Sequence, residues 1–210
     1  ATQLQAELWK EAGLPDGVLN VVHGDQVAVN RLLNHPDVAA ISFVGSTPVA
    51  KHIYETGTAQ GKRVQALGGA KNHMVVLPDA DLARAVPPGI AASFRNLGQS
   101  CSAPTRMIVP RERLAEVEAL AAKAAAEIVV GDPTLEATTH GAIANRGQFD
   151  RIQAMIGDAI AEGAKLLVGG QGRPGGLNVG LFVKPTIFTD VRTDMRIAQD
   201  EVFGPVLCII

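Results

Sequence analysis

The sequence predicts an α/β protein in which parallel strands alternate with helices. Short β-type runs and amphipathic helical patterns follow one another along the first third of the chain. The order strand, helix, strand places parallel strands in one sheet, with the helices on its faces. The chain has 210 residues, 47% of them hydrophobic, which is enough to bury a substantial core. This length corresponds to one large domain or to two smaller ones.

The elements of the first third follow from hydrophobic spacing and from turn residues. Gly13 and the turn Leu14-Pro15-Asp16-Gly17 end the first helical pattern. His35-Pro36 ends the second, because the residue before a proline avoids helical backbone. We expect helices over residues 1–12, 27–34 and from 48 onward, and strands over 18–22, 39–44 and 63–67.

The remaining two thirds continue this alternation with longer helices. Pro87 and Pro88 interrupt the first of them, and we expect a kink or a break there because proline lacks the N–H that a helix needs. We expect helices over residues 82–94, 113–130 and 145–162, and strands over 74–77, 107–109, 165–168, 182–188 and 206–210.

Charge and cysteine content exclude several classes of function. The formal net charge is −2 at pH 7, so no basic surface is predicted for nucleic acid or anionic lipid. The two cysteines, Cys101 and Cys208, form no CxxC pair, which argues against a disulfide framework and against a metal site. No apolar run reaches the roughly 20 residues of a membrane span. We expect a soluble, cytoplasmic protein with no nucleic-acid or membrane partner.

Cys101 is the candidate catalytic residue. It lies in the turn-prone segment Gly98-Gln99-Ser100-Cys101-Ser102, between a helical pattern and a β-type run. A free cysteine is often only a small buried hydrophobe, and that interpretation stays open. Against it, the neighbouring residues supply no apolar socket, and a loop thiol near backbone N–H groups can act as a nucleophile.

A second candidate site follows the strand over 39–44, where Gly45-Ser46-Thr47-Pro48 begins a helix. Serine or threonine at the N-cap and proline in the first turn are typical of a helix start. The free N–H groups and the dipole of such an N-terminus favour an anion such as a pyrophosphate. A capped turn without a ligand is the alternative.

Three further positions were weighed for a role in binding. The pair Gly68-Gly69 allows a backbone or a ligand to approach closely. Lys71, beside this pair, could be a catalytic or binding cation, but a lysine beside a turn is most often just solvated. The carboxylate of Glu201 could accept hydrogen bonds from the two hydroxyls of a ribose, although acidic residues on loops are usually just solvated.

Four motifs, taken in their order and spacing, resemble those of the aldehyde dehydrogenase superfamily. They are Phe43-Val44-Gly45-Ser46-Thr47, Leu67-Gly68-Gly69-Ala70-Lys71, Gly98-Gln99-Ser100-Cys101-Ser102-Ala103 and Glu201-Val202-Phe203-Gly204-Pro205. The resemblance implies that Cys101 is the thiolate that attacks an aldehyde carbonyl, with its own backbone N–H in the oxyanion hole. It also implies that NAD or NADP contacts Gly45, Ser46, Gly68, Glu201 and Phe203. In that set, Ser46 would bind the pyrophosphate and Glu201 the nicotinamide ribose.

Leu67 distinguishes this chain from the hydrolytic members of the family. Those members have Glu-Leu-Gly-Gly-Lys at this motif, with the glutamate as general base. Alignment on Lys71 places Leu67 at the glutamate, and alignment on the glycine pair places Ala66 there. Neither side chain can deprotonate water. The front half resembles methylmalonate-semialdehyde dehydrogenases, in which coenzyme A takes the acyl group and needs less help from a base. The segment around Cys101 is more similar to hydrolytic NAD-dependent members, because Ser100 stands where the CoA-dependent enzymes have arginine. The chain therefore looks mosaic.

The resemblance also implies a domain organisation. We expect residues 1–69 to form part of a Rossmann-type NAD-binding domain and residues 70–210 to form an α/β catalytic domain with Cys101. Family members are more than twice this long, so we expect the chain to be a fragment. Three functions stay open: CoA-acylating oxidation of an aldehyde or semialdehyde, hydrolytic oxidation to the free acid, and a truncated, inactive binding module. The partners implied are a small aldehyde and further copies of the chain, because exposed sheet edges must be covered.

Overall fold

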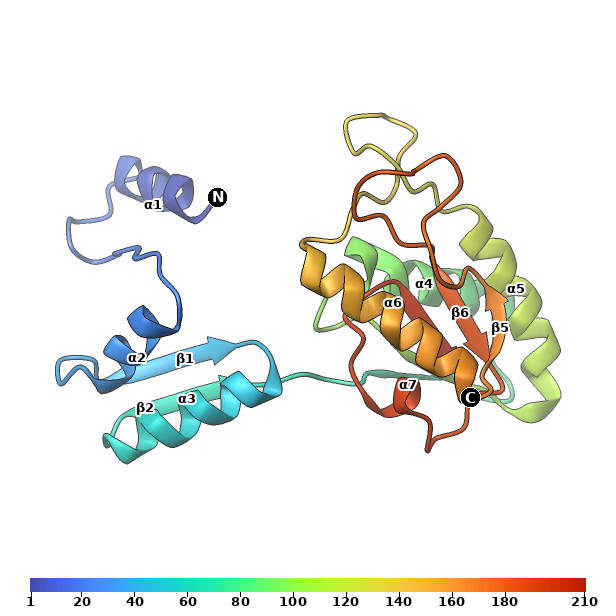
Figure 1. The fold of residues 1–210 in the computed structure, drawn as a ribbon, viewed down its shortest axis with the longest axis horizontal. Helices are drawn as coiled ribbons and strands as arrows, with labels where there is room; N and C mark the ends of the chain where they lie inside the picture. Colours follow the sequence, from blue (N-terminus) through green and yellow to red (C-terminus); the bar gives the residue numbers. More distant parts are fainter. The chain divides into compact units, whose positions relative to one another are not determined.

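The computed structural model describes all 210 residues. They form two compact units, one of residues Ala1–Gly69 and one of residues Ala70–Ile210, coloured blue to cyan and cyan to red in Figure 1. None of the helices has both the length and the apolar character needed to cross a membrane.

The first unit contains a parallel β-α-β arrangement. Strand β1 (Ala40–Val44) pairs in parallel with β2 (Arg63–Leu67), and helix α3 (Thr47–Ala59) connects them. The helix lies directly on the strands, because a Cβ on Gly57 would stand 2.7 Å from a methyl carbon of Val64. Helices α1 (Thr2–Glu11) and α2 (Gln26–Asn34) come before them in the chain. The helices and the two later strands predicted for this part are confirmed.

The strand predicted over residues 18–22 is wrong. Val18 and Val22 are 66% and 74% exposed, and the run contains no strand. The sheet of this unit consists of β1 and β2 alone, so no hydrogen-bonded ladder reaches the run. Valine-rich composition favours a strand, but a strand forms only where a partner strand accepts its hydrogen bonds.

The second unit is built on a five-stranded sheet in the order β3-β4-β7-β6-β5. The strands are β3 (His73–Val75), β4 (Arg106–Ile108), β5 (Lys165–Val168), β6 (Thr186–Thr189) and β7 (Val206–Ile209). All neighbours are parallel except β5, which runs antiparallel to β6 at the edge of the sheet. An antiparallel edge strand on an otherwise parallel sheet is common. The run predicted over 182–188 forms a strand only after Pro185, which cannot donate to a ladder.

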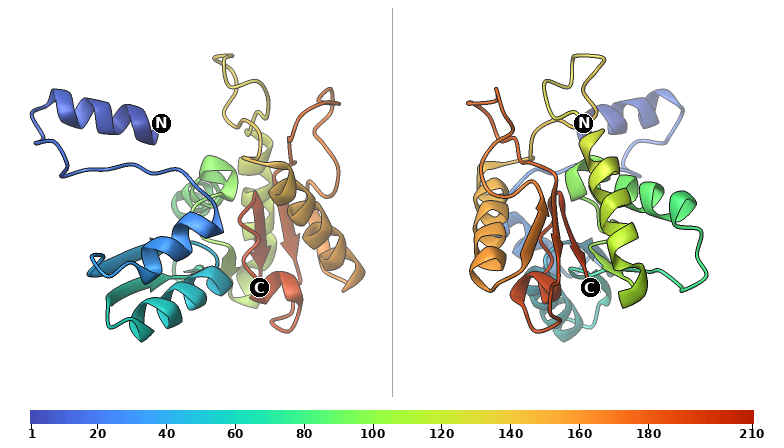
Figure 2. Two further views of the ribbon diagram at one scale, coloured as in Figure 1. Left: turned by 60° about the vertical axis from the view of Figure 1, so that its left-hand side comes forward. Right: turned by 90° about the vertical axis from the view of Figure 1, so that its right-hand side faces the viewer.

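Helices cover both faces of this sheet (Figure 2). The helices α4 (Leu82–Phe94) and α5 (Leu114–Ala126) lie on one face, and α6 (Arg146–Ala161) lies on the other with the short α7 (Arg196–Gln199). Alternate side chains of β7 enter two separate apolar clusters. Val206 and Cys208 face the cluster that contains residues of α6, while Leu207 and Ile209 face the cluster of α4 and α5. The unit therefore has three layers, helix, sheet and helix.

Helix α4 runs without a break through Pro87 and Pro88, so of the kink or break predicted there the break is excluded. Val86, Ile90 and Phe94 form a stripe on this helix and are at most 1% exposed. Burial of such large side chains contributes roughly 1.5–3 kcal/mol each, which offsets the loss of two helical hydrogen bonds.

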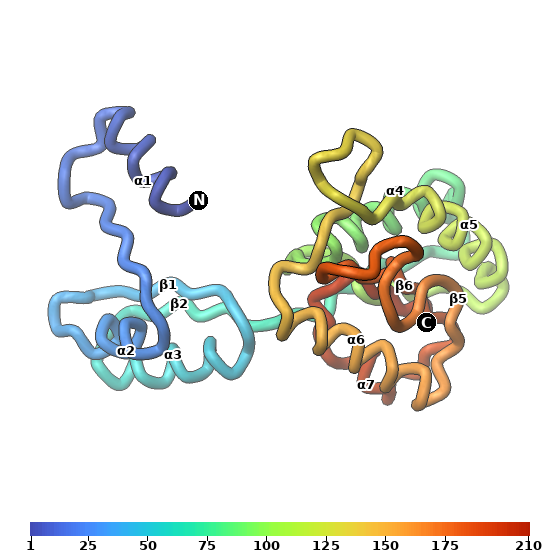
Figure 3. The backbone as a smooth tube through the Cα atoms, turned by 45° about the horizontal axis from the view of Figure 1, so that its top comes forward, coloured from blue at the N-terminus to red at the C-terminus, as the bar shows by residue number.

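Short 3-10 turns join these elements. They are η1 (Arg95–Gly98), directly after α4, and η2 (Arg111–Arg113), directly before α5. Figure 3 traces the long connections from α5 to α6 and from β5 to β6. Neither α7 nor the two 3-10 turns was predicted from the sequence pattern.

Candidate active site

Cys101 lies on the exposed connection between η1 and β4. Three residues with positive φ precede it: Asn96 at 51°, Leu97 at 59° and Gly98 at 66°. Leucine rarely adopts this conformation, which costs about 1–2 kcal/mol. The side chain of Leu97 is 5% exposed and packs in the cluster of α6, so burial holds the turn in place. The candidate nucleophile therefore projects from a strained turn that is anchored in the core.

The side chain of Asn72 holds the backbone of this loop. Its amide nitrogen Nδ2 donates to the carbonyl oxygens of Cys101 at 2.7 Å and of Ala103 at 3.0 Å. The backbone carbonyl oxygen of Asn72 accepts from the backbone N–H groups of Thr105 and Arg106, both at 3.1 Å. One residue thus binds both ends of the segment from Cys101 to Arg106. No motif in the sequence had pointed to Asn72.

Glu201 and Phe203 lie in the connection between α7 and β7, and four successive carbonyl oxygens of this connection accept side-chain hydrogen bonds. The pairs are Lys71 Nζ with Asp200 O at 2.8 Å, Arg151 Nη2 with Glu201 O at 2.6 Å, and Gln148 Nε2 with Val202 O at 2.8 Å and Phe203 O at 2.9 Å. Phe203 has a positive φ of 52°. The backbone that presents Glu201 and Phe203 is therefore fixed from α6 and from the residues before β3.

Lys71 is more buried than the sequence analysis predicted. It is partly buried rather than fully solvated, and desolvation lowers the pKa of its ammonium group. The carboxylates of Asp200 and Glu201 act in the opposite direction and favour its charged form. The prediction of a merely solvated cation is wrong, because the tertiary fold places this side chain against the connection after α7.

The other cysteine has a different environment. Cys208 is 1% exposed on β7, and its sulfur lies 3.6 Å from the carbonyl oxygen of Ile197. Burial raises the pKa of the Cys208 thiol to about 11, with Lys71 and Arg106 acting in the opposite direction. Cys208 is therefore a buried residue of the core, whereas Cys101 is exposed.

The three candidate residues of the first unit lie at the carboxyl ends of β1 and β2. Gly45 donates its backbone N–H to the carbonyl oxygen of Leu67 at 3.0 Å, which joins the two strand ends. Ser46 is the N-cap residue of α3, but its side chain makes no capping hydrogen bond. The hydroxyl of Thr47 instead accepts from the N–H of Gly69 at 3.0 Å. A Cβ on Gly68 would stand 2.9 Å from this same hydroxyl, so the approach requires glycine.

The carboxyl ends of β1 and β2 and the N-terminus of α3 suit an anionic, extended ligand. The first N–H groups of α3 have no helical acceptor, and the free hydroxyl of Ser46 adds another donor beside them. The carboxyl ends of parallel strands are the usual place for a dinucleotide in α/β sheets. The residues present therefore fit a nucleotide cofactor. No group of three or more His, Cys, Asp or Glu side chains is placed to hold a metal ion.

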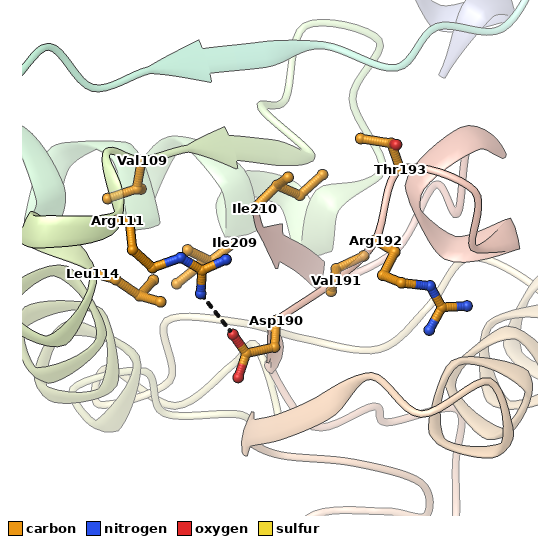
Figure 4. A pocket seen from close by; sticks show the side chains of 9 residues that line it. All are labelled: Val109, Arg111, Leu114, Asp190, Val191, Arg192, Thr193, Ile209 and Ile210. Carbon is orange, nitrogen blue, oxygen red and sulfur yellow. Dashed lines mark hydrogen bonds and ion pairs between the residues drawn. The ribbon is translucent and has the colours of Figure 1, made fainter.

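Two cavities of the second unit are lined by residues other than Cys101, Glu201 and Phe203. One of about 390 Å³ is lined by residues that follow β4, β6 and β7, with Arg111 paired to Asp190 at 3.4 Å across it (Figure 4). Another of about 620 Å³ lies between α4 and α5. None of the residues that line either cavity belongs to the candidate site.

The whole chain, residues 1–210, matches the family model described as the aldehyde dehydrogenase family. The chain belongs to this family, and the resemblance drawn from its four motifs is confirmed. The α/β fold is confirmed as well. The chain matches Aldehyde Dehydrogenase C from Pseudomonas syringae, a cysteine-to-alanine mutant complexed with NAD+ and octanal, at 53% identity and a TM-score of 0.97. The aligned region covers 100% of this chain and 43% of the Pseudomonas syringae chain.

Two curated relatives are themselves named as dehydrogenases of semialdehydes. Malonate-semialdehyde dehydrogenase 2 from Geobacillus kaustophilus is 47% identical over 205 residues, which are 98% of this chain and 42% of the relative. The 3-succinoylsemialdehyde-pyridine dehydrogenase from a Pseudomonas species is 46% identical over 208 residues, which are 99% of this chain and 44% of the relative. The chain thus spans less than half the length of the curated relatives it matches.

Proposed function

We propose that this chain supplies the nucleophile and part of the cofactor site of an NAD-dependent dehydrogenase that oxidises a semialdehyde. One observation supports this most directly: Cys101 is exposed on a loop whose backbone Asn72 fixes at Cys101 and at Ala103. A positioned, accessible thiol is what covalent catalysis by cysteine requires. The name of the malonate-semialdehyde relative, at 47% identity, supports a short semialdehyde as the substrate.

The chemistry follows from the thiolate of Cys101. Its sulfur forms a bond to the aldehyde carbon, and the carbonyl oxygen takes up the negative charge beside the backbone N–H of Cys101. NAD, when bound, supplies the acceptor for the hydride that leaves this carbon. A thioester on Cys101 remains. Attack by an acyl acceptor then breaks the bond to sulfur and restores the thiolate.

We assign the cofactor to Gly45, Ser46, Gly68, Glu201 and Phe203. The N-terminus of α3 with the free hydroxyl of Ser46 suits a pyrophosphate, and the missing Cβ of Gly68 leaves room for close backbone approach. The half-buried carboxylate of Glu201 suits the two hydroxyls of a ribose. The NAD+ of the Pseudomonas syringae structure supports NAD as the dinucleotide.

Coenzyme A is the acyl acceptor that Leu67 favours. Leu67 ends β2 with half of its surface exposed and presents no base at the position where hydrolytic members have a carboxylate. A thiol needs less base assistance than water does. Hydrolysis to the free acid is the second candidate, favoured by Ser100 before the nucleophile and by the 53% identity to a structure with octanal.

We also propose a reducing compartment and a homo-oligomer. Catalysis requires Cys101 as a free thiol, and an exposed thiol stays free only in a reducing environment such as the cytoplasm. The β1 and β2 strands leave backbone groups at the edges of their sheet, which further strands or a partner copy would cover.

Product analysis with and without coenzyme A tests the proposal. Malonate semialdehyde or octanal is mixed with NAD and the protein, and NADH and acyl products are measured in a single turnover. Acyl-CoA as the main product, with NADH release faster when coenzyme A is present, supports the acylating enzyme. Equal NADH release in both cases with free acid alone contradicts the CoA assignment and supports hydrolysis.

Matched cysteine variants test the nucleophile. Cys101→Ala should reduce NADH formation at least about 1,000-fold, because no other group forms the covalent intermediate. Cys208→Ala removes the buried thiol and should leave most of the activity. If equilibrium dialysis shows no NAD binding and Cys101 reacts with iodoacetamide no faster than free cysteine, the chain is an inactive binding module.

A further inference from the structure

Two consecutive residues, Lys71 and Asn72, reach the two loops of the second unit that contain proposed site residues. Asn72 binds the loop of Cys101, and Lys71 binds the connection of Glu201 and Phe203. Both side chains are partly buried. The two loops are 100 residues apart in the sequence, so no local preference can set their relative position.

Asn72 contributes to both sides of its contact with the Cys101 loop. Its side-chain Nδ2 donates to Cys101 O and Ala103 O, and its backbone carbonyl oxygen accepts from Thr105 N and Arg106 N. The hydroxyl of Thr105 also lies 3.3 Å from the carbonyl oxygen of Asn72. Because His73, the next residue, begins β3 and pairs with Arg106 on β4, the asparagine is itself tied to the sheet.

Lys71 makes a charge-assisted hydrogen bond from Nζ to the carbonyl oxygen of Asp200 at 2.8 Å. Asp200 directly precedes Glu201, and Phe203 follows with a φ of 52°. A hydrogen bond from a charged donor is roughly twice as strong as one between neutral groups. Together with the hydrogen bond from the backbone N–H of Asp200 to the carbonyl oxygen of Arg196 at 2.9 Å, it constrains the start of the connection that contains Glu201 and Phe203.

We propose that Lys71 and Asn72 are a pair of positioning residues that set Cys101 and Glu201 relative to each other. The α-carbons of consecutive residues stand about 3.8 Å apart across a planar peptide bond, so the two contacts start from neighbouring points of one backbone segment. The inference rests on the proposed function, because it assumes that Cys101 reacts with the substrate and that Glu201 binds the cofactor. Lys71 and Asn72 act only through these two residues.

The variants Lys71→Met and Asn72→Ala test the pair in the full chain. Lys184→Met is the matched control, because Lys184 also donates to a backbone carbonyl, that of Gln171 at 2.9 Å, and is equally partly buried. The measurements are the dissociation constant for NAD, the rate of Cys101 alkylation by iodoacetamide, and kcat with the aldehyde. Hydrogen exchange of backbone amides reports the two loops separately.

We expect Lys71→Met to affect NAD binding and Asn72→Ala to affect the reactivity of Cys101. Lys71→Met should weaken NAD binding about tenfold, the loss of one charge-assisted hydrogen bond, and leave the alkylation rate within about twofold of the unmodified chain. Asn72→Ala should change the alkylation rate and lower kcat about 100-fold, since a misplaced nucleophile costs this much, with NAD binding within about twofold. Lys184→Met should change none of the three measurements by more than about twofold.

The same pattern of changes in both variants overturns the inference. If both variants shift NAD binding and alkylation in equal proportion, or if both behave like Lys184→Met, the pair is only structural. If the chain without substitutions binds no NAD, the proposed function fails, and hydrogen exchange of the backbone amides then tests the positioning roles alone. Faster exchange at residues 101–106 in Asn72→Ala and at residues 200–203 in Lys71→Met supports these roles. Equal exchange in the variants and in the chain without substitutions contradicts them. If either variant does not fold, Lys71→Gln, which is polar but removes the charge, and Asn72→Asp, which keeps the size but cannot donate to the two carbonyl oxygens, should give the same separation.

Discussion

Gly98 lies against Gly204 so closely that a Cβ on Gly98 would stand 2.0 Å from the carbonyl oxygen of Gly204. Gly98 is three residues before Cys101, and Gly204 directly follows Phe203. The turn that presents the candidate nucleophile is therefore in backbone contact with the connection that presents Glu201 and Phe203. Side-chain contacts from Asn72 and Lys71 act on the same two segments.

Gly98→Ala should destabilise the chain by about 3 kcal/mol or more. The new methyl group would collide with backbone atoms of Gly204, and the φ of 66° at this position is itself unfavourable for alanine. Denaturant unfolding measures the loss of free energy. Gly175→Ala is the control, since a Cβ there meets no atom within 4 Å, and it should change stability by less than about 0.5 kcal/mol. Equal stability of the two variants would show that the turn relaxes freely.

Leu67→Glu should increase the fraction of free acid among the products at least about tenfold, because it adds a general base where none exists. Leu67 is 50% exposed, so the carboxylate should be tolerated with little loss of stability. Chromatography of acyl-CoA and free acid after one turnover provides the measurement. Leu77→Glu, at a position that is 60% exposed, controls for the added charge. An unchanged product ratio in Leu67→Glu would indicate that another group already activates water.

Cys208 should lower the stability of the chain at alkaline pH. Its pKa is raised from 9.0 to about 11 by burial, so between these values the folded chain keeps a proton that the unfolded chain releases. Stability is therefore lost as the pH rises from 9 toward 11, by about 2–3 kcal/mol. Lys71 has the opposite sign, since its lowered pKa makes stability rise with pH up to 10.5.

The comparison with Cys208→Ala measures this effect together with the loss of its coulombic interaction with Lys71, which is present in both proteins. The variant should be less stable at pH 7, where it loses buried contacts, and the difference in unfolding free energy should narrow by about 2 kcal/mol by pH 11. Val206→Ala, on the same strand and 2% exposed, should show a difference that does not depend on pH. A constant difference for Cys208→Ala would mean that its thiol titrates alike in both states.

Local patterns in the sequence were sufficient for most of the helices and strands. The helical pattern over 82–94 predicted α4, and Asn145 and Ser46 marked the starts of α6 and α3. The failures share a cause that lies outside the local sequence. The run at 18–22 lacks a partner strand, and α4 continues through two prolines because the core holds it.

The sequence by itself determined the family, the fold class and the thiol at position 101, because these depend on residue types at set spacings. Only the tertiary structure decided that Cys101 is exposed while Cys208 is buried, and that Lys71 and Asn72 bind two loops far apart in the chain. Spacing along a chain specifies which elements form. Which side chains meet is decided by packing, since a contact between residues 72 and 101, or 98 and 204, exists only once the sheet has brought them together.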